Sequence, residues 1–176
     1  ATISVRAVLY TVPSRLIGSR LKVHIYDDWL VCWLGTTPLL TLARRFHKRG
    51  APRQRVVDYR HLIGALVRKP QAFRRSIFRD ELYPRPVFRR AWEVIDDHLE
   101  PRKACRVYVG LLHLAAMHAC EAALADHLQK VLDRGEVPDL EGARGAVAPS
   151  PTDTPQVSVR APDLGGYDQL LGGAVG

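Results

Sequence analysis

The spacing of apolar residues along the 176-residue chain changes once, near Asp58, from a period of two to a period of about 3.6. Before Asp58, apolar residues alternate with polar or exposed neighbours over 3–9 and again over 21–25. Alternation of this kind puts every second side chain on one face of a β-strand. The pattern therefore predicts strands at both places, followed by further strands over 29–34 and 39–42.

Short turns join these predicted strands. Asp27–Asp28 forms a turn between two of the strands, and residues 35–38 form another. Val56 and Val57 could form the last strand. Four or five short strands in so few residues favour a small, strongly twisted barrel, because an open sheet of this size would expose its edges. We expect an SH3-like β-barrel over residues 1–57, in a chain of the α+β class.

Residues 58–134 are predicted to form a helical domain. Asp58 is a suitable N-cap for a first helix that ends near Pro70, since proline lacks the N–H that would continue a helix and can begin the next one. Phe73 and Ile77 lie four residues apart and predict a second helix, with basic residues on its other face.

Two longer helical patterns follow. Apolar residues spaced by four over 87–99 predict a third helix. A proline at 101 begins a fourth pattern that continues to 132, and the sequence leaves open whether Gly110 and the region 118–120 bend or break it.

From residue 135 onward Pro, Gly, Ser and Thr accumulate, so this part of the chain has too little apolar area to offset its ordering entropy. We predict a flexible linker and tail over 135–176. The segment 162–171 is acidic and apolar, which indicates a tethered docking peptide, with an ordinary frayed terminus as the alternative. Its candidate partner-binding residues are Leu164, Tyr167, Leu170 and Leu171.

Charge is distributed unevenly along the chain. Of the 26 Lys and Arg, 22 lie at or before Arg106 together with 9 of the 18 acids, so this part carries 22 − 9 = +13 and the remainder 4 − 9 = −5. Clustered cations bind a phosphate backbone by releasing its counterions, although charged runs are often only solvated surface. A basic loop over 44–55 leads into the first helix, and the candidate DNA-binding residues are Arg44, Arg45, Lys48, Arg49, Arg53, Arg55, Arg60, Arg68, Lys69, Arg75 and Arg79.

The spacing of the cysteines and the length of the apolar stretches argue against a disulfide-rich, a zinc-binding and a membrane-spanning protein. The three cysteines are odd in number and lack paired short spacings, so we expect free thiols and neither a disulfide framework nor a zinc ribbon. No stretch reaches the roughly eighteen apolar residues of a membrane-spanning helix, and the alternating N-terminal residues are unlike a secretory signal. A cytoplasmic protein is the expectation.

The sequence contains no pattern typical of a catalytic or metal site. The acid pairs Asp27–Asp28, Asp80–Glu81 and Asp96–Asp97 are explained by turns, helix ends and solubility, whereas a two-metal nuclease needs three converging carboxylates. His113 and His118 would project about 140° apart on a helix, so they would not share a metal. The sequence predicts no catalytic residue and no metal site.

Four segments taken in order resemble a known family. They read VPSRLIGSRLKVHIYDDWLVCWLG, VVDYRHLIGALVRKPQAF, RDELYPR and CRVYVGLLHLAAMHACEAALA. Together they resemble the C-terminal part of the IstA-type transposases of bacterial insertion sequences, over most of residues 8–134, and the closing YDQLL resembles the end of that family.

This resemblance implies a function and a set of partners. Proteins of that family begin with a helix-turn-helix region and an RNase H-like domain, which holds an Asp, Asp, Glu metal site. A small β-barrel and a helical region follow, and these would correspond here to about residues 4–57 and 58–134. None of the catalytic carboxylates maps onto this chain, so Mg²⁺ is expected only for the missing catalytic domain. The expected function is a non-enzymatic part of a transposase that binds double-stranded DNA, further transposase copies and an IstB-type AAA+ ATPase, in the nucleoid of a bacterium.

Two other functions stay open. The chain could be a stand-alone protein-interaction module whose basic surface serves solubility, and partner binding that is insensitive to salt, without affinity for DNA, would favour that interpretation. An independent metal-dependent hydrolase is the weakest hypothesis, because no set of converging carboxylates is present in the sequence.

Overall fold

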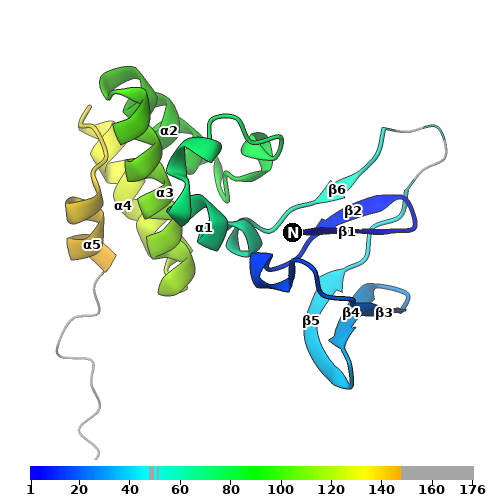
Figure 1. Cartoon of the computed structure of the whole chain (residues 1–176). Coiled ribbons are helices and arrows are strands. Elements are labelled where there is room, and N and C mark those ends of the chain that lie inside the picture. Colours follow the sequence, from blue (N-terminus) through cyan, green and yellow to red (C-terminus); the bar gives the residue numbers. More distant parts are fainter. Residues whose placement is uncertain (48–49, 51, 148–176) are drawn as a thin grey trace, which may run out of the picture.

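The computed structural model describes residues 1–47, 50 and 52–147. The protein is of the α+β class, as the sequence predicts, with a strand unit followed by a helical unit (Figure 1). Among these residues, no helix combines the length and the apolar character needed to cross a membrane. The predicted docking peptide over 162–171 lies outside the described residues.

The strand unit consists of two three-stranded sheets. In the first, β1 and β2 form an antiparallel hairpin and β6 pairs with β2 in parallel; in the second, β3, β4 and β5 form an antiparallel meander. The strands are β1 (Thr2–Val5), β2 (Val8–Thr11), β3 (Lys22–Ile25), β4 (Trp29–Leu34), β5 (Thr37–Ala43) and β6 (Arg55–Val56).

The two sheets share one small core. Val8 and Tyr10 from β2 and Leu30 from β4 are almost completely buried there, surrounded by partly buried aliphatic side chains of both sheets. In the described part of the chain, no ladder of strand hydrogen bonds joins the two sheets, so the structure shows two packed sheets and does not show the closure of the expected SH3-like barrel.

The segment 3–9 folds differently from the single strand that its alternation predicts. A two-residue turn at Arg6 and Ala7 divides it into β1 and β2, and both turn residues have left-handed backbone angles, φ 49° and 66°. Such turns match the twist of a hairpin but usually contain Asn or Gly, and that signal is missing here. As a consequence Val8 and Tyr10 face the core, and Leu9 does not belong to the core cluster.

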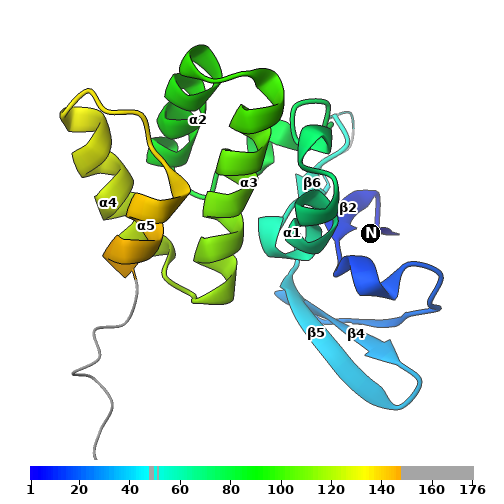
Figure 2. The ribbon, with the colours of Figure 1, turned by 60° about the vertical axis from the view of Figure 1, so that its left-hand side comes forward.

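The helical unit is built around α3. The helices are α1 (Tyr59–Arg68), α2 (Pro86–His98), α3 (Pro101–Met117), α4 (Glu121–Asp133) and α5 (Leu140–Val147). Figure 2 shows α3 between α1 on one side and α4 and α5 on the other. Tyr108, Leu111 and Leu112 of α3 are fully buried, which makes this helix the centre of the larger core.

The predicted second helix is replaced by two single 3₁₀ turns, η2 (Pro70–Ala72) and η3 (Arg79–Glu81). Phe73 is 0 % exposed and Ile77 is 75 % exposed, so these two residues do not share an apolar face. The Oγ atom of Ser76 accepts a hydrogen bond from the N–H of Phe78 at 3.1 Å, and such local bonds compete with helix formation. The prediction of a helix here is wrong for this reason.

The other helix predictions are confirmed. Asp58 caps α1 through a 2.9 Å bond from the N–H of Arg60, and α2 matches the predicted third helix. The long fourth pattern breaks at Ala119, whose φ of 49° separates α3 from α4.

Part of the predicted linker is helical. After α4 the chain returns to α3, and α5 packs there with Leu140 against Gly110, where an added Cβ would lie 2.9 Å from a methyl carbon of Leu140. Ala143 is fully buried, and Asp139 accepts a 2.8 Å bond from the N–H of Gly142 as a helix cap. The helical unit therefore extends at least to Val147, because tertiary packing outweighs the poor helix propensity of a glycine-containing segment.

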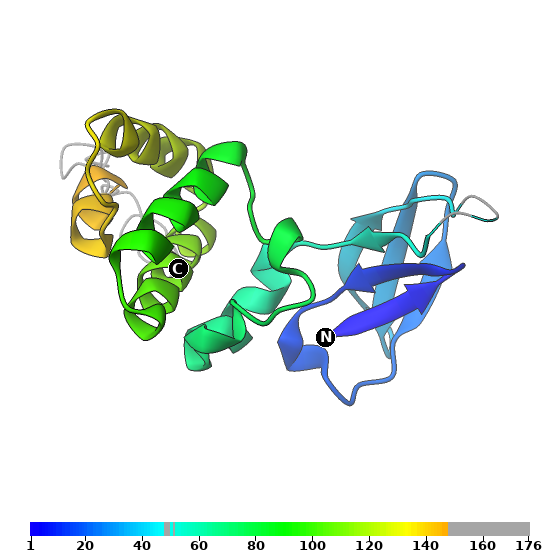
Figure 3. The ribbon, with the colours of Figure 1, turned by 90° about the horizontal axis from the view of Figure 1, so that it is seen from above.

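The strand unit and the helical unit meet at the start of α1 (Figure 3). The Oγ of Ser14 donates to the carbonyl of His61 at 3.0 Å, and the N–H of Asp58 donates to the Oγ1 of Thr11 at 2.9 Å. These bonds fix α1, and the residues that follow it, relative to the sheets.

Candidate nucleic-acid interface

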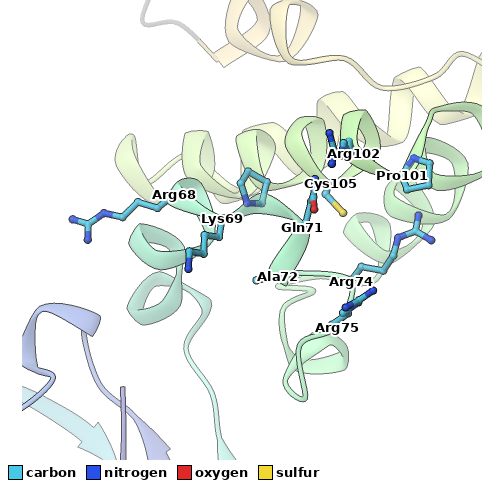
Figure 4. A pocket seen from close by; sticks show the side chains of 10 residues that line it. Arg68, Lys69, Gln71, Ala72, Arg74, Arg75, Pro101, Arg102 and Cys105 are labelled. Atoms are coloured by element: carbon cyan, nitrogen blue, oxygen red, sulfur yellow. The ribbon is translucent and has the colours of Figure 1, made fainter.

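The larger of two neighbouring hollows lies where α1 ends, η2 begins and α3 starts. Its volume is about 730 Å³, and five of its lining side chains are Lys or Arg while none is acidic. Figure 4 shows these side chains around the hollow, which we call the basic groove. Its lining residues are Arg68, Lys69, Pro70, Gln71, Ala72, Arg74, Arg75, Pro101, Arg102 and Cys105.

Local structure places the cations of the basic groove. The N–H of Lys69 closes the end of α1 by donating to the carbonyls of Ala65 and Leu66, and Pro70 then begins η2. Phe73 anchors the next residues, because its ring lies 4.7 Å from the rings of both Trp92 and Tyr108 in the core. Arg74 and Arg75, directly after this anchor, are held at the rim of the groove.

The third side of the basic groove is the N-terminus of α3. Pro101 and Arg102 form its first turn, and this helix of 17 residues points the positive end of its dipole into the groove region. Helix N-termini bind anions, and here the dipole adds to side-chain charge. The arrangement can therefore bind phosphate groups.

The cations of the groove differ in how far they are already neutralised. Arg74 forms an ion pair with Asp96 and lies over the ring of Trp92 at 5.6 Å, so it also has a structural role. The other four have no carboxylate within 4.0 Å among the described residues. These four are Arg68, Lys69, Arg75 and Arg102.

A second, smaller hollow of about 380 Å³ continues the groove toward the strand unit. It shares Arg68 and Lys69 with the first hollow and adds Arg15, which lies just after β2. Basic side chains therefore line both hollows, from the strand unit across the end of α1 to the start of α3.

None of the described residues of the predicted basic loop over 44–55 belongs to the groove lining. The guanidinium of Arg44 donates to the carbonyl of Tyr26 at 2.8 Å, and the backbone N–H of Arg45 donates to the hydroxyl of Tyr10 at 2.9 Å. Arg53 is exposed. Lys48 and Arg49 lie outside the described residues.

Three further predicted cations lie apart from the groove. Arg55 donates to the carbonyl of Ile77 at 2.9 Å and lies 3.9 Å from Glu81. Arg60 pairs with Glu121 at 3.2 Å, and Arg79 is exposed in η3. Of the predicted set, the structure therefore brings Arg68, Lys69 and Arg75 together in one groove.

Sequence reasoning missed Arg15, Arg74 and Arg102 as members of this surface. Arg102 could have been noticed, because Pro101 marks a helix start and a cation in the first turn is electrostatically unfavourable unless an anion offsets it. The other two depend on how distant segments pack.

Glu121 connects three segments and has a structural role. Its carboxylate accepts hydrogen bonds from Tyr59 at 3.3 Å, from Arg60 at 3.2 Å and from Arg85 at 3.3 Å. Burial, with Glu121 nearby, raises the pKa of Tyr59 to about 12. Within the described residues no three His, Cys, Asp or Glu side chains are grouped as metal ligands would be.

Comparison with known proteins gives one relative of similar sequence. The chain is 44 % identical over 172 residues to a protein of Sinorhizobium fredii (strain NBRC 101917 / NGR234) that is named "Uncharacterized protein y4jA/y4nE/y4sE". The alignment covers 97 % of this chain and 34 % of that protein, so the chain spans about a third of its relative's length. No protein-family model matches the chain, and no solved structure matches it.

Proposed function

We propose that this chain is a non-catalytic, C-terminal part of an IstA-type DNA transposase, which binds duplex DNA and supports assembly of the transposition complex. The basic groove is the observation that carries this proposal. Four cations without carboxylate partners in the described structure line it together with the N-terminus of α3, and none of the lining residues is acidic. Such an arrangement favours a polyanionic partner, such as a phosphate backbone, over a neutral one.

The groove binds phosphates and does not read bases in this proposal. Its cations come from a helix end, a 3₁₀ turn and a helix start, so none of the described helices presents them as one row to the major groove. Phosphate contacts position a protein on DNA without specifying sequence. We therefore expect little sequence preference and a steep dependence of affinity on salt.

The remaining parts of the proposed function follow from the sequence resemblance. The relative from Sinorhizobium fredii is about three times as long as the aligned region, so that protein has room for further domains. Strand transfer with Mg²⁺ would belong to such a domain, and further transposase copies and an IstB-type ATPase would be the partners, in the nucleoid of the bacterial cytoplasm. The segment 162–171 would serve as the docking peptide.

The proposal is tested by comparing two variants of equal charge. Replacing Arg68, Lys69 and Arg75 together by alanine removes three cations from the basic groove, whereas replacing Lys130, Arg134 and Arg144 removes three from α4, α5 and the turn after α4. The affinity for a duplex is measured by fluorescence anisotropy over a range of salt. The groove variant should flatten the slope of log affinity against log salt by roughly 0.9 for each phosphate that is no longer bound, and the control should not.

Equal slopes for the two triple variants would refute the groove as the DNA site, since only net charge would then matter. No measurable duplex binding by the unaltered chain at low salt would refute DNA binding altogether.

A protein-interaction module is the second candidate function. Three apolar side chains far apart in the sequence are well exposed: Ile17 (73 %), Ile77 (75 %) and Met117 (67 %). Contiguous exposed apolar surface marks partner sites, whereas scattered apolar residues are ordinary. Binding of a protein partner that is insensitive to salt, in a chain without DNA affinity, would favour this function over the first.

A further inference from the structure

The outer face of the β3–β4–β5 sheet carries aromatic side chains. Along β4, Leu30 and Cys32 are fully buried, so the alternation puts Trp29 and Trp33 on the opposite face of the strand, where Trp33 is half-buried with its indole Nε1 covered. Trp29 is 48 % exposed although tryptophan gains more than most residues from burial. Figure 1 shows the β3–β4 hairpin on the side of the strand unit remote from the helices.

The aromatic rings on this face occur in pairs. The ring of His24 lies 5.5 Å from that of Trp33, and the ring of Tyr26 lies 5.9 Å from that of Trp29. Because Trp29 and Trp33 are four residues apart on one strand, these two tryptophans are about 13 Å from each other along β4. We call these four residues, His24, Tyr26, Trp29 and Trp33, the aromatic face.

Cations lie among the rings. Lys22 is directly opposite Trp33 in the sheet register, and the guanidinium of Arg44 donates to the carbonyl of Tyr26 at 2.8 Å. The same guanidinium lies 4.4 Å from the ring centre of Phe46, which is 61 % exposed. Ten Lys and Arg are distributed over residues 1–57, whereas the two acids of this range, Asp27 and Asp28, lie in the β3–β4 turn between Tyr26 and Trp29.

Rings interleaved with cations match the chemistry of an unpaired nucleic-acid strand. Every base has a flat face that stacks on an aromatic ring, while cations bind the phosphates between the bases. A duplex keeps its bases stacked inside, so it could not use the rings. An apolar protein partner would use the rings but would gain little from Lys22 and Arg44.

We infer that the aromatic face binds single-stranded DNA by stacking bases on Trp29 and Trp33, with Lys22 and Arg44 contacting the backbone. This surface is separate from the basic groove, so the inference does not depend on duplex binding there. It gives the chain a second nucleic-acid site, selective for unpaired strands.

The test uses a fluorescein-labelled oligo(dT) with the full chain. Anisotropy measures its affinity, and quenching of protein fluorescence by unlabelled oligo(dT) reports on Trp29 and Trp33, because the third tryptophan, Trp92, is buried in the helical core. Trp29→Ala should weaken oligo(dT) binding on the order of 10-fold, since each stacked base contributes about 5-fold to 150-fold to affinity. Trp29→Phe, which keeps a ring, should weaken it much less.

Two controls separate this site from the basic groove. Trp29→Ala should leave duplex affinity within about two-fold, and Ile77→Ala, at an exposed apolar residue outside the aromatic face, should leave oligo(dT) affinity unchanged. Weaker duplex binding by the groove variant, with oligo(dT) affinity retained, would support two separate sites.

Three outcomes would overturn the inference. The first is the absence of tryptophan quenching when the unaltered chain is saturated with oligo(dT), and the second is an unchanged oligo(dT) affinity of Trp29→Ala. The third is an unaltered chain that sediments as a dimer which Trp29→Ala dissociates, because the face would then join two copies of the chain.

Discussion

Phe73 and Ile77 provide a sharp test of how the segment between α1 and α2 packs. Four residues apart, they would contribute equally to the apolar side of a helix, but in the structure Phe73 is 0 % exposed and Ile77 is 75 % exposed. Alanine at the two positions should therefore have very different effects on the free energy of unfolding.

The expected magnitude follows from the surroundings of Phe73. Its ring contacts those of Tyr83, Trp92 and Tyr108 with centroids 4.7 to 6.0 Å apart. Truncating a buried phenylalanine costs about 3–5 kcal/mol, and leucine in its place should cost roughly 1–3 kcal/mol because the volume is largely kept while the aromatic pairs are removed. Ile77→Ala should stay within about 0.5 kcal/mol of the unaltered chain.

Urea unfolding followed by circular dichroism measures these differences as shifts of the midpoint at constant slope. Because Phe73 holds Arg74 and Arg75 at the groove, Phe73→Leu should also weaken duplex binding at temperatures where the variant is still folded. A loss of less than about 1 kcal/mol for Phe73→Ala, or equal losses at the two positions, would refute this packing.

Three further predictions concern single positions. Ala7→Gly should raise the free energy of unfolding, measured in urea, by about 1 kcal/mol, because glycine tolerates the left-handed φ of 66° that strains alanine. A destabilised variant would contradict the turn geometry. Burial raises the pKa of Tyr59 to about 12, so the stabilisation that this shift gives the fold is fully present below pH 10, the ordinary pKa, and is lost as the pH rises toward 12. Tyr59→Phe should therefore flatten the free energy of unfolding over that pH range, and an unchanged pH profile in this variant would contradict the shift. Gly110→Leu should displace Leu140 and release α5 from α3. The amides of 140–147 should then exchange hydrogen faster while those of α1–α4 are unaffected, and full protection of α5 in this variant would disprove the contact.

Local signals in the sequence account for most of the helical unit. Each helix has signals within its own stretch of chain, and the helices begin and end close to them. These signals are Asp58 as the N-cap of α1, proline in the first turns of α2 and α3, and apolar residues spaced by four. The break at Ala119 could be suspected but not decided, because left-handed alanine has no sequence signature.

The errors occur where packing between distant segments decides the local structure. The β1–β2 turn uses Arg6 and Ala7 in place of the usual turn residues, and α5, which Asp139 caps, is held in the core by Leu140 packing at Gly110 on another helix. Neither effect has a local pattern in the sequence. The groove has the same origin, since Arg68 and Arg102 are far apart in the chain and meet only through the packing of α1 on α3.

Tyr10 closes the base of the segment between β5 and β6. Its hydroxyl accepts a bond from the N–H of Arg45 at 2.9 Å, and its backbone is paired with Val56 at the other end of the segment. Because one buried residue holds both ends, the number of residues between them can change without altering the sheets, and doubling a loop costs only about 0.6 kcal/mol in closure entropy. This segment is therefore the natural place to insert a reporter peptide or a fluorescent label into the folded chain.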